Sequence, residues 1–151
     1  MQNQTQYRIA QPEDLEKIYQ FAELQLKSKI SDEMEQMMAI WNSRFRKEAL
    51  EHYLKLGWSF IAENKQNQCT GFFLGQPFLF FQGQTQSLWV ELVQATSAET
   101  KAELIEIAYK LARDKHIQQV LLPAEIQGDL NGKNIPLQPI KEPFLWAKTT
   151  K

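Results

Sequence analysis

Cysteine and histidine are scarce in this chain of 151 residues. It contains one cysteine, Cys69, and two histidines, His52 and His116. A single cysteine excludes an internal disulfide and a thiolate metal cluster. The histidines stand apart, without acidic residues at metal-ligand spacing, so we expect no metal site. Cys69 has no histidine near it in sequence, and we interpret it as a small core residue rather than a nucleophile.

The chain also lacks an excess of either charge and any long apolar run. Seventeen Lys and Arg residues against eighteen Asp and Glu give a net charge of −1. Nucleic-acid binding requires a concentrated basic face, which this balance does not indicate. No apolar run approaches the ~20 residues that cross a bilayer, and the first residues, MQNQTQYR, lack the apolar core of a signal peptide. We expect a cytoplasmic protein that binds neither nucleic acid nor membranes.

The residues that are present predict a single α+β domain over 1–151, with a hydrophobic content of 43%. Alternation and β-branched or aromatic residues predict strands over 6–10, 58–63, 69–75, 87–94, 118–123 and 144–149. Helical spacing predicts helices from Pro12, from Ser31 or Asp32, over 46–56 with Gly57 as the stop, and over about 97–115. A helix between 87–94 and 118–122 implies that these strands are parallel. The remaining turns are short, so we expect a mixed, mainly antiparallel sheet flanked by helices.

Two apolar segments each have two interpretations. The stripe Met34, Met37, Met38, Trp41 and Phe45 lines either a ligand groove or the core, and we favour the core. The segment PFLFFQG, residues 77–83, has no alternation. It forms either an exposed surface, such as a homodimer contact or an acceptor-pocket wall, or an interior strand. We favour the interior strand.

One strand-to-helix junction is a candidate anion site. The segment QATSAETK, residues 94–101, leads into the long helix without glycine or arginine. Helix N-termini attract anions, and Ser97, Thr100 and Lys101 add hydroxyls and a positive charge. However, Thr96 and Glu99 have the spacing of a reciprocal capping box, which would occupy backbone N–H groups and place a carboxylate beside any phosphate.

Three segments share an order with a known family. RIAQPEDL leads into the first helix, WSFIAEN…TGFFLG forms a hairpin, and SLWVELV comes before the long helix and the strand QQVLLP. This order resembles the GNAT superfamily of acyl-CoA-dependent N-acetyltransferases. The likeness covers about residues 7–123, with a weaker match at 144–149. It implies acyl transfer from acyl-CoA to a small-molecule or protein amine. The backbone near Val93 and Gln94 would hold the pantetheine, and the turn from Thr96 to Lys101 the pyrophosphate.

Two departures from that family's pattern weaken the expectation of cofactor binding and of activity. The family carries Q/R-x-x-G-x-G/A at the junction where this chain has QATSAETK. Its members often have a tyrosine acid after the fifth strand, whereas residues 124–143 contain no tyrosine. From the first departure we expect acetyl-CoA binding to be weak or absent, and from the second we can name no general acid.

Glu91, in the middle of the strand 87–94, is the candidate catalytic base, because a strand carboxylate can take a proton from an amine. The alternative is that Glu91 faces solvent or pairs with an Arg or Lys. Glu63 has a weaker claim, because the adjacent polar turn predicts exposure.

Two further functional classes stay open: a non-catalytic module of the same fold that binds a partner or small molecule, and an unrelated α+β domain.

Overall fold

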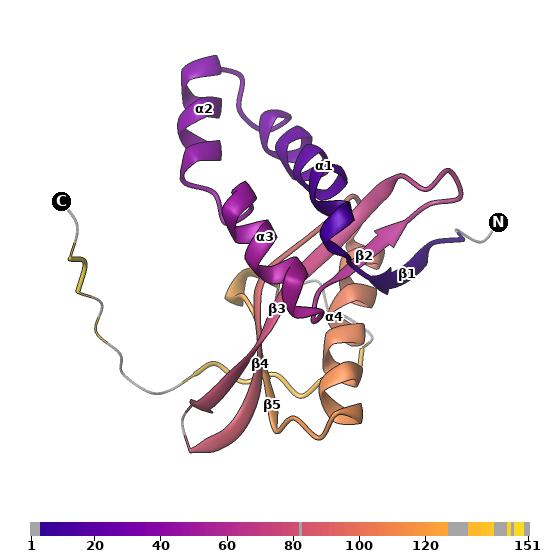
Figure 1. Cartoon of the computed structure of the whole chain (residues 1–151), viewed down its shortest axis with the longest axis vertical. Helices are drawn as coiled ribbons and strands as arrows, with labels where there is room; N and C mark the ends of the chain where they lie inside the picture. Colours follow the sequence, from indigo (N-terminus) through magenta and orange to yellow (C-terminus); the bar gives the residue numbers. More distant parts are fainter. Residues whose placement is uncertain (1–3, 82, 127–132, 141–144, 146, 150–151) are drawn as a thin grey trace.

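The computed structural model describes residues 4–81, 83–126, 133–140, 145 and 147–149. Within them the chain forms five strands and four α-helices around one sheet (Figure 1). The strands are β1 (Gln6–Ile9), β2 (Phe60–Glu63), β3 (Cys69–Phe81), β4 (Gln84–Ala95) and β5 (Gln119–Leu121). The helices are α1 (Leu15–Lys27), α2 (Glu33–Trp41), α3 (Lys47–Leu56) and α4 (Ala98–Asp114), with a 3-10 turn at Pro12–Asp14 before α1.

The sheet has the order β1-β2-β3-β4-β5, so each strand lies beside its neighbours in sequence. The first four strands are antiparallel, and β5 is parallel to β4 because α4 crosses between them. The expected α+β architecture is thus confirmed. Of the strand expected over 144–149, residues 144 and 146 lie outside the described residues. Residues 145 and 147–149 are described and are not in a strand.

The two faces of the sheet are covered by different helices, as Figure 1 shows. Because strand side chains alternate, neighbouring residues of β3 enter different cores. Phe72 packs with α1 and α3, whereas Phe73 packs with α4. The α1–α3 core also contains Leu74 and Leu92, and the α4 core contains Leu88 and Val90.

Helix α2 begins where the sequence indicated, since the Asp32 carboxylate caps it by accepting from the Glu35 N–H at 2.9 Å. The core assignment of its apolar stripe is wrong, except for Phe45, which lies beyond the helix and is 2% exposed. No residue of α2 is buried. The helix stands out beyond the sheet (Figure 1). Helical spacing therefore predicted an apolar face correctly, but it did not indicate whether that face points toward the sheet or away from it.

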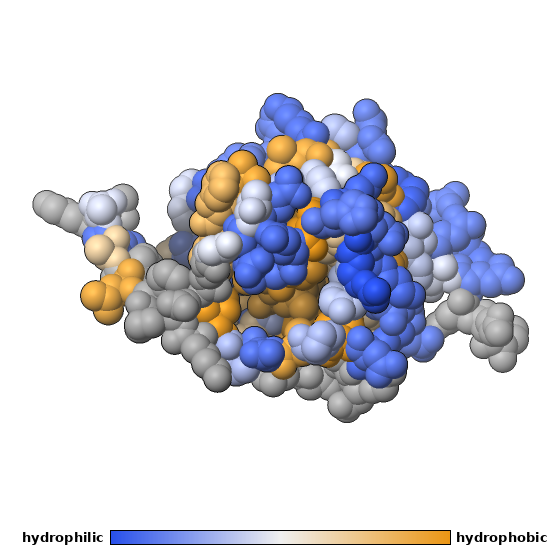
Figure 2. All heavy atoms as spheres, turned by 90° about the horizontal axis from the view of Figure 1, so that it is seen from below, coloured by the Kyte–Doolittle hydropathy of each residue, from blue (hydrophilic) through white to orange (hydrophobic). Residues whose placement is uncertain are grey.

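The segment 77–83 is also not an interior strand. Strands β3 and β4 continue past the cores as a two-stranded hairpin, on which Leu79 and Phe80 are 60% and 77% exposed. Figure 2 looks at the molecule from the end that carries this hairpin and shows apolar side chains at the surface among polar ones. An exposed extension replaces the expected interior strand because none of the described helices extends over the hairpin.

Gly75 is required where β3 passes the chain segment before β2. A Cβ there would lie 2.7 Å from the Trp58 carbonyl oxygen, a backbone atom that cannot move alone. We expect Gly75→Ala to lower the free energy of unfolding by about 1–3 kcal/mol, the usual cost of overpacking. Urea denaturation measures this change. Gly83→Asn is the matched control, because Gly83 has φ +77° and nothing within 4 Å of a Cβ. Asparagine tolerates that conformation, so its effect should stay within about 0.5 kcal/mol.

Candidate functional site

A fork opens between β4 and β5. The parallel ladder joins only Ser87–Gln119, Leu88–Val120 and Trp89–Leu121. Beyond Trp89, β4 continues to Ala95 with β3 on one side and no β5 on the other. A fully paired ladder would have contradicted the resemblance stated above. Instead, among the described residues, positions 90–95 of β4 have a free edge that leads directly to the start of α4.

A β-bulge lies at the base of this fork. Leu92 pairs with Leu74 and Val90 with Gly75, which leaves Glu91 as the extra residue of β4. A bulge shifts the alternation of a strand, so Glu91 and Leu92 share the α1–α3 face. The bulge therefore turns the Glu91 carboxylate toward α3.

The Glu91 carboxylate lies within a cluster of donors. The Trp89 indole Nε1–H donates to its Oε2 at 2.7 Å. The Arg44 guanidinium lies 3.7 Å from Oε1 and also donates to the Glu91 carbonyl oxygen at 3.4 Å. The carboxylate keeps 25% of its surface exposed. Glu91 thus pairs with an arginine, as one interpretation expected, and still faces solvent at the fork.

Tyr53 of α3 completes the cluster. Burial, together with the negative charge and hydrogen bonding of Glu91, raises the pKa of Tyr53 to about 12. The phenol therefore keeps its proton throughout the physiological range. It can donate to the carboxylate or to a reacting group, but it cannot act as a base there.

Neither Tyr53 nor Arg44 was singled out from the sequence. They lie 38 and 47 positions before Glu91, on and just before a helix that reaches β4 only in the folded chain. Tyr53 lies on the apolar side of α3 among the residues that form the core. No local pattern distinguishes such a tyrosine from ordinary packing.

The predicted capping box at the start of α4 is wrong. Ser97, one residue later than expected, caps the helix: its hydroxyl accepts from the Thr100 N–H at 3.1 Å and donates to the Thr100 hydroxyl at 3.0 Å. The Thr96 N–H instead donates to the Thr70 carbonyl at 2.9 Å, because β3 and β4 remain paired up to this point. The sheet thus delays the helix start, and the argument that a capping box occupies these donors no longer holds.

The other residues expected to hold cofactor are distributed along the fork and the junction. Val93 is buried on the α4 face, whereas Gln94 lies opposite Phe72. The Gln94 Oε1 is buried and has no hydrogen-bond partner among the described residues. Thr96 is exposed, and Lys101 is partly exposed in the first turns of α4, with its N–H bonded to the Ser97 carbonyl. The buried, unsatisfied amide oxygen of Gln94 is a feature that a ligand donor would complete.

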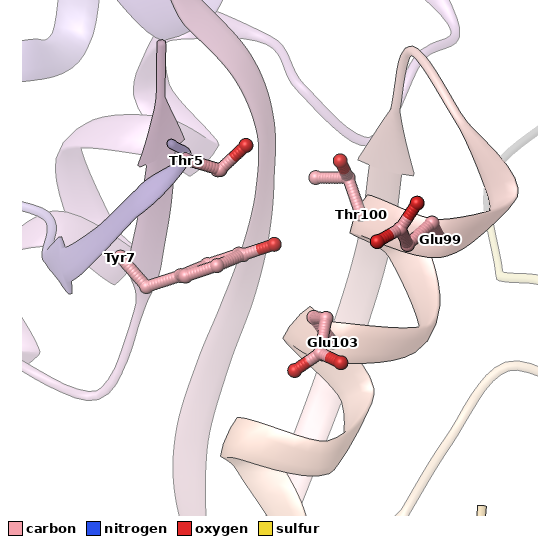
Figure 3. Close-up of a pocket in the computed structure, with 5 residues that line it drawn as sticks. All are labelled: Thr5, Tyr7, Glu99, Thr100 and Glu103. Carbon is pink, nitrogen blue, oxygen red and sulfur yellow. The ribbon is translucent and has the colours of Figure 1, made fainter. Parts of the chain in front are cut away.

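A small hollow of about 180 Å³ lies between β1 and the start of α4, lined by Thr5, Tyr7, Glu99, Thr100 and Glu103 (Figure 3). Burial raises the pKa of Tyr7 there. Two carboxylates line this hollow, and β1 is at the opposite end of the sheet from β5. The hollow shares Glu99 and Thr100 with the start of α4, and its two carboxylates disfavour a phosphate on that side of the helix.

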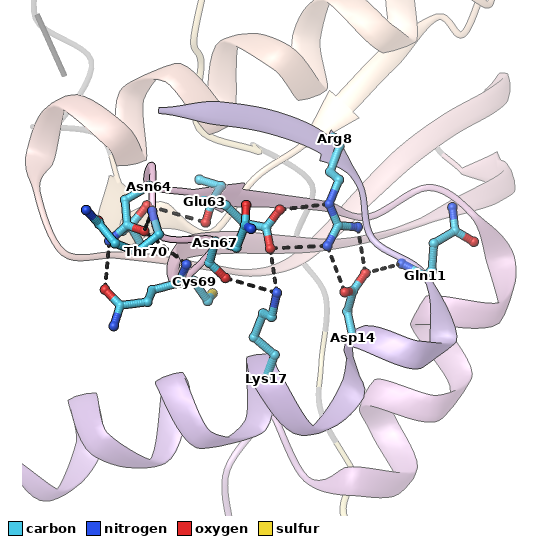
Figure 4. Close-up of polar contacts among 12 residues, drawn as sticks. Arg8, Gln11, Asp14, Lys17, Glu63, Asn64, Asn67, Cys69 and Thr70 are labelled. Atoms are coloured by element: carbon cyan, nitrogen blue, oxygen red, sulfur yellow. Dashed lines mark hydrogen bonds and ion pairs between the residues drawn. The ribbon is translucent and has the colours of Figure 1, made fainter. Parts of the chain in front are cut away.

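Glu63 is not exposed as expected, being 5% accessible. Its carboxylate accepts from Arg8 Nε at 2.8 Å and from Lys17 Nζ at 2.6 Å, and Arg8 also pairs with Asp14 at 2.8 Å (Figure 4). The hydrogen bonds from Arg8 lower the pKa of Glu63 and of Asp14. A carboxylate held this way is a structural ion and a poor base.

The remaining sequence interpretations concern groups away from the fork. Burial raises the pKa of the Cys69 thiol to about 12, which supports a packing role. Within the described ranges, no three His, Cys, Asp or Glu side chains gather as a metal site would require. None of the helices in the described part of the chain is both long and apolar enough to cross a bilayer.

No protein-family model matches the sequence, and no curated protein matches it. Solved structures do match. The protein TTHA1254 of Thermus thermophilus superposes with a TM-score of 0.66 at 20% identity, covering 96% of this chain and 99% of its own. A predicted acetyltransferase from Clostridium acetobutylicum, solved with acetyl-CoA, has a TM-score of 0.64 at 11% identity over 95% and 96% of the two chains. The PaiA N-acetyltransferase of Thermoplasma acidophilum, solved with coenzyme A, has a TM-score of 0.59 at 15% identity over 82% of each chain. With the forked sheet and its order of elements, these matches show that the chain has the fold of the GNAT superfamily of N-acetyltransferases.

Proposed function

We propose that the chain transfers an acyl group from acyl-CoA to a primary amine. The observation that carries this proposal is the fork, where residues 90–95 of β4 lack β5 and lead directly into the N-terminus of α4. A strand edge that no other described strand pairs with suits an amide-containing chain such as pantetheine. The helix start suits its pyrophosphate. The two structural neighbours with bound acetyl-CoA or coenzyme A are consistent with this assignment.

Each part of the fork has a role in this proposal. The edge of β4 at Val93 and Gln94 holds the pantetheine, and the buried Gln94 Oε1 accepts from one of its amide N–H groups. The turn that contains Thr96, Ser97 and the residues up to Lys101 receives the pyrophosphate. The Glu91 carboxylate takes a proton from the attacking amine, directly or through a water. Tyr53, which stays protonated, and Trp89 orient that carboxylate.

Cofactor binding is the first test. Acetyl-CoA at a hundredfold excess over its dissociation constant should stabilise the folded chain by about 2.7 kcal/mol. For a chain of this length that corresponds to a rise in melting temperature of about 5–10 °C. Differential scanning fluorimetry measures it, with ATP as a nucleotide control that lacks the pantetheine. No shift at about 1 mM acetyl-CoA, or an equal shift with ATP, would contradict an acyl-CoA site.

Glu99 should weaken the binding of CoA, because it is an exposed carboxylate in the first turn of α4. Two unit charges about 8 Å apart in water repel by about 0.5 kcal/mol, and the pyrophosphate carries about two. We expect Glu99→Gln to raise CoA affinity about two- to fivefold at low salt, with the gain shrinking as salt screens the charges. Isothermal titration with CoA measures this. Glu103→Gln is the control, since Glu103 lies one turn further along α4 and pairs with Lys133. An equal gain in both variants would exclude a local effect at the helix start.

The non-catalytic alternative keeps one observation in its favour, the exposed apolar surface on α2 and on the β3–β4 hairpin. A module that binds CoA but releases no thiol with any primary amine would fit that alternative. The binding and turnover measurements therefore distinguish the two functions.

A further inference from the structure

A row of aromatic rings on the β3–β4 hairpin begins at the candidate base. The Trp89 indole Nε1–H donates to Glu91 Oε2 at 2.7 Å. The centre of the Trp89 ring lies 6.0 Å from that of Phe78, and the centre of the Phe78 ring lies 5.3 Å from that of Phe81. We call Trp89, Phe78 and Phe81 the aromatic row. It connects the Glu91 carboxylate with the outer end of the hairpin.

The aromatic row lies on the same side of the sheet as α3. The two neighbours of Trp89 in β4 both enter the α4 core, so Trp89 faces the α3 side. Phe78 shares that side because it lies two residues after Gln76, whose Oε1 is hydrogen-bonded to Nε2 of His52 on α3 at 2.8 Å. Phe78 is 36% exposed, and Trp89 and Phe81 are half-buried. The row is therefore open to solvent directly beside the base.

The surroundings of the aromatic row carry no charge that would select a charged substrate tail. Residues 76–90 contain no Asp, Glu, Lys or Arg. Arg44 is paired with Glu91 itself at 3.7 Å, and on α3 Lys55 is paired with Glu51 at 3.4 Å. A second ammonium or a carboxylate on the acceptor would lose hydration along residues 76–90 without an opposite charge to replace it. An uncharged apolar tail instead gains by leaving water there.

We propose that the aromatic row is the acceptor subsite and that it selects primary monoamines with an uncharged apolar tail, an aromatic ring on a two-carbon linker fitting best. This inference rests on the proposed acyl transfer, since it takes Glu91 as the group that receives the amine. The Trp89 ring begins one hydrogen bond away from the carboxylate, so a short linker brings the tail onto it. Aromatic tails also gain from edge or offset contacts with Trp89 and Phe78.

Transfer to such an amine uses groups already described. The nitrogen forms an amide bond with the acyl carbon, the C–S bond of the thioester breaks, the amine proton passes to Glu91, and CoA leaves as its thiolate. The aromatic row takes no part in this step and acts only on the binding of the tail. Its effect is therefore expected in the affinity for the acceptor and in KM.

The binding of three amines tests this selectivity without requiring turnover. Isothermal titration of the full chain, with CoA at about 1 mM, should give phenethylamine a dissociation constant at least about tenfold below that of ethylamine, because the ring leaves water against the row. Cadaverine, whose tail ends in a second ammonium, should bind no better than ethylamine. Equal affinity for phenethylamine and ethylamine would overturn the subsite, as would tightest binding of cadaverine.

Substitution of Phe78 locates the tail. Phe78→Ala should weaken phenethylamine binding about three- to tenfold and leave ethylamine binding unchanged, because ethylamine is too short to reach that ring. Leu79→Ala is the matched control, since Leu79 is the next residue, is 60% exposed and faces the other side of the hairpin. It should change neither affinity, and circular dichroism checks that both variants fold. An equal loss of phenethylamine binding in the two variants, or no loss in Phe78→Ala, would rule out the aromatic row as the subsite.

Thiol release from acetyl-CoA with the same amines separates this inference from the proposed function. We expect kcat/KM for phenethylamine to exceed that for ethylamine at least about tenfold, mainly through KM. Selective binding without thiol release would contradict acyl transfer and leave the aromatic row as an amine-binding subsite. Thiol release with equal kcat/KM for all three amines would support acyl transfer and overturn the subsite.

Discussion

Replacement of Glu91 by glutamine is expected to lower the rate of acyl transfer by about 10²–10⁴-fold, the usual contribution of a general base. Glutamine keeps the size of the side chain and can still accept from the Trp89 indole, but it cannot take a proton from the amine. The measurement is thiol release from acetyl-CoA with primary amines of different classes, such as a polyamine and a short peptide with a free N-terminus. CoA affinity, measured by titration, should remain unchanged, because the loss lies in the chemical step.

Tyr53→Phe is the matched variant for that experiment. Tyr53 touches the same carboxylate from α3 but keeps its proton, since its pKa is about 12. If it only orients Glu91, its loss should lower the rate by less than about tenfold and leave the pH profile between about 6 and 9 unchanged. A Glu91→Gln variant as active as the wild type would exclude Glu91 as the base. A Tyr53→Phe variant as impaired as Glu91→Gln would instead assign Tyr53 a direct part in proton transfer.

The largest change in stability is expected at Arg8. This side chain joins β1 to both Glu63 of β2 and Asp14, which are buried. Arg8→Met leaves two buried carboxylates with fewer partners, a change that costs about 3–5 kcal/mol when the pair is fully buried. Because Arg8 itself is 40% exposed, we expect about 2–3 kcal/mol at pH 7, measured by urea denaturation. Lys17→Met should cost less, because Lys17 contacts Glu63 and not Asp14.

The difference in unfolding free energy between the wild type and Arg8→Met should depend on pH, because Asp14 and Glu63 titrate. Hydrogen bonds from Arg8 hold the folded-state pKa of Asp14 and of Glu63 below the usual values. Their contribution to stability is thus present above the unfolded pKa of about 4 and is lost as the pH falls through the lower folded pKa. In Arg8→Met the carboxylates protonate at a higher pH than in the wild type, so the difference in unfolding free energy between the two proteins should narrow as the pH falls below about 4. A difference that stays constant with pH would show that packing of Arg8, rather than its charge, stabilises the sheet.

The order of elements could be predicted from the sequence because its determinants are local. Alternation marked the strands, Asp32 and Gly57 marked helix ends, and the helix between β4 and β5 implied their parallel arrangement. Each of these signals depends on residues within a few positions of one another. The resemblance to the GNAT fold followed from that order and from the segments RIAQPEDL, WSFIAEN…TGFFLG and QQVLLP, and did not require the cofactor motif.

The sites depend on contacts between distant segments, which local patterns do not contain. The N-cap of α4 is Ser97 instead of the predicted Thr96, because β4 is still paired with β3 at this point and the Thr96 N–H donates to the Thr70 carbonyl. The cluster around Glu91 exists because a bulge turns this carboxylate toward α3.

The sequence by itself determined the order of the helices and of the five observed strands, where several helices begin and end, and that α2 has one apolar side. Only the tertiary structure decided which way that side faces, because helical spacing defines a stripe without reference to the rest of the body. It also decided that Glu63 is a buried structural ion, through Arg8 and Lys17 from two other elements. Among the described residues, β4 has a free edge because β5 ends at Leu121, and a strand's partners are set by the packing of the whole chain.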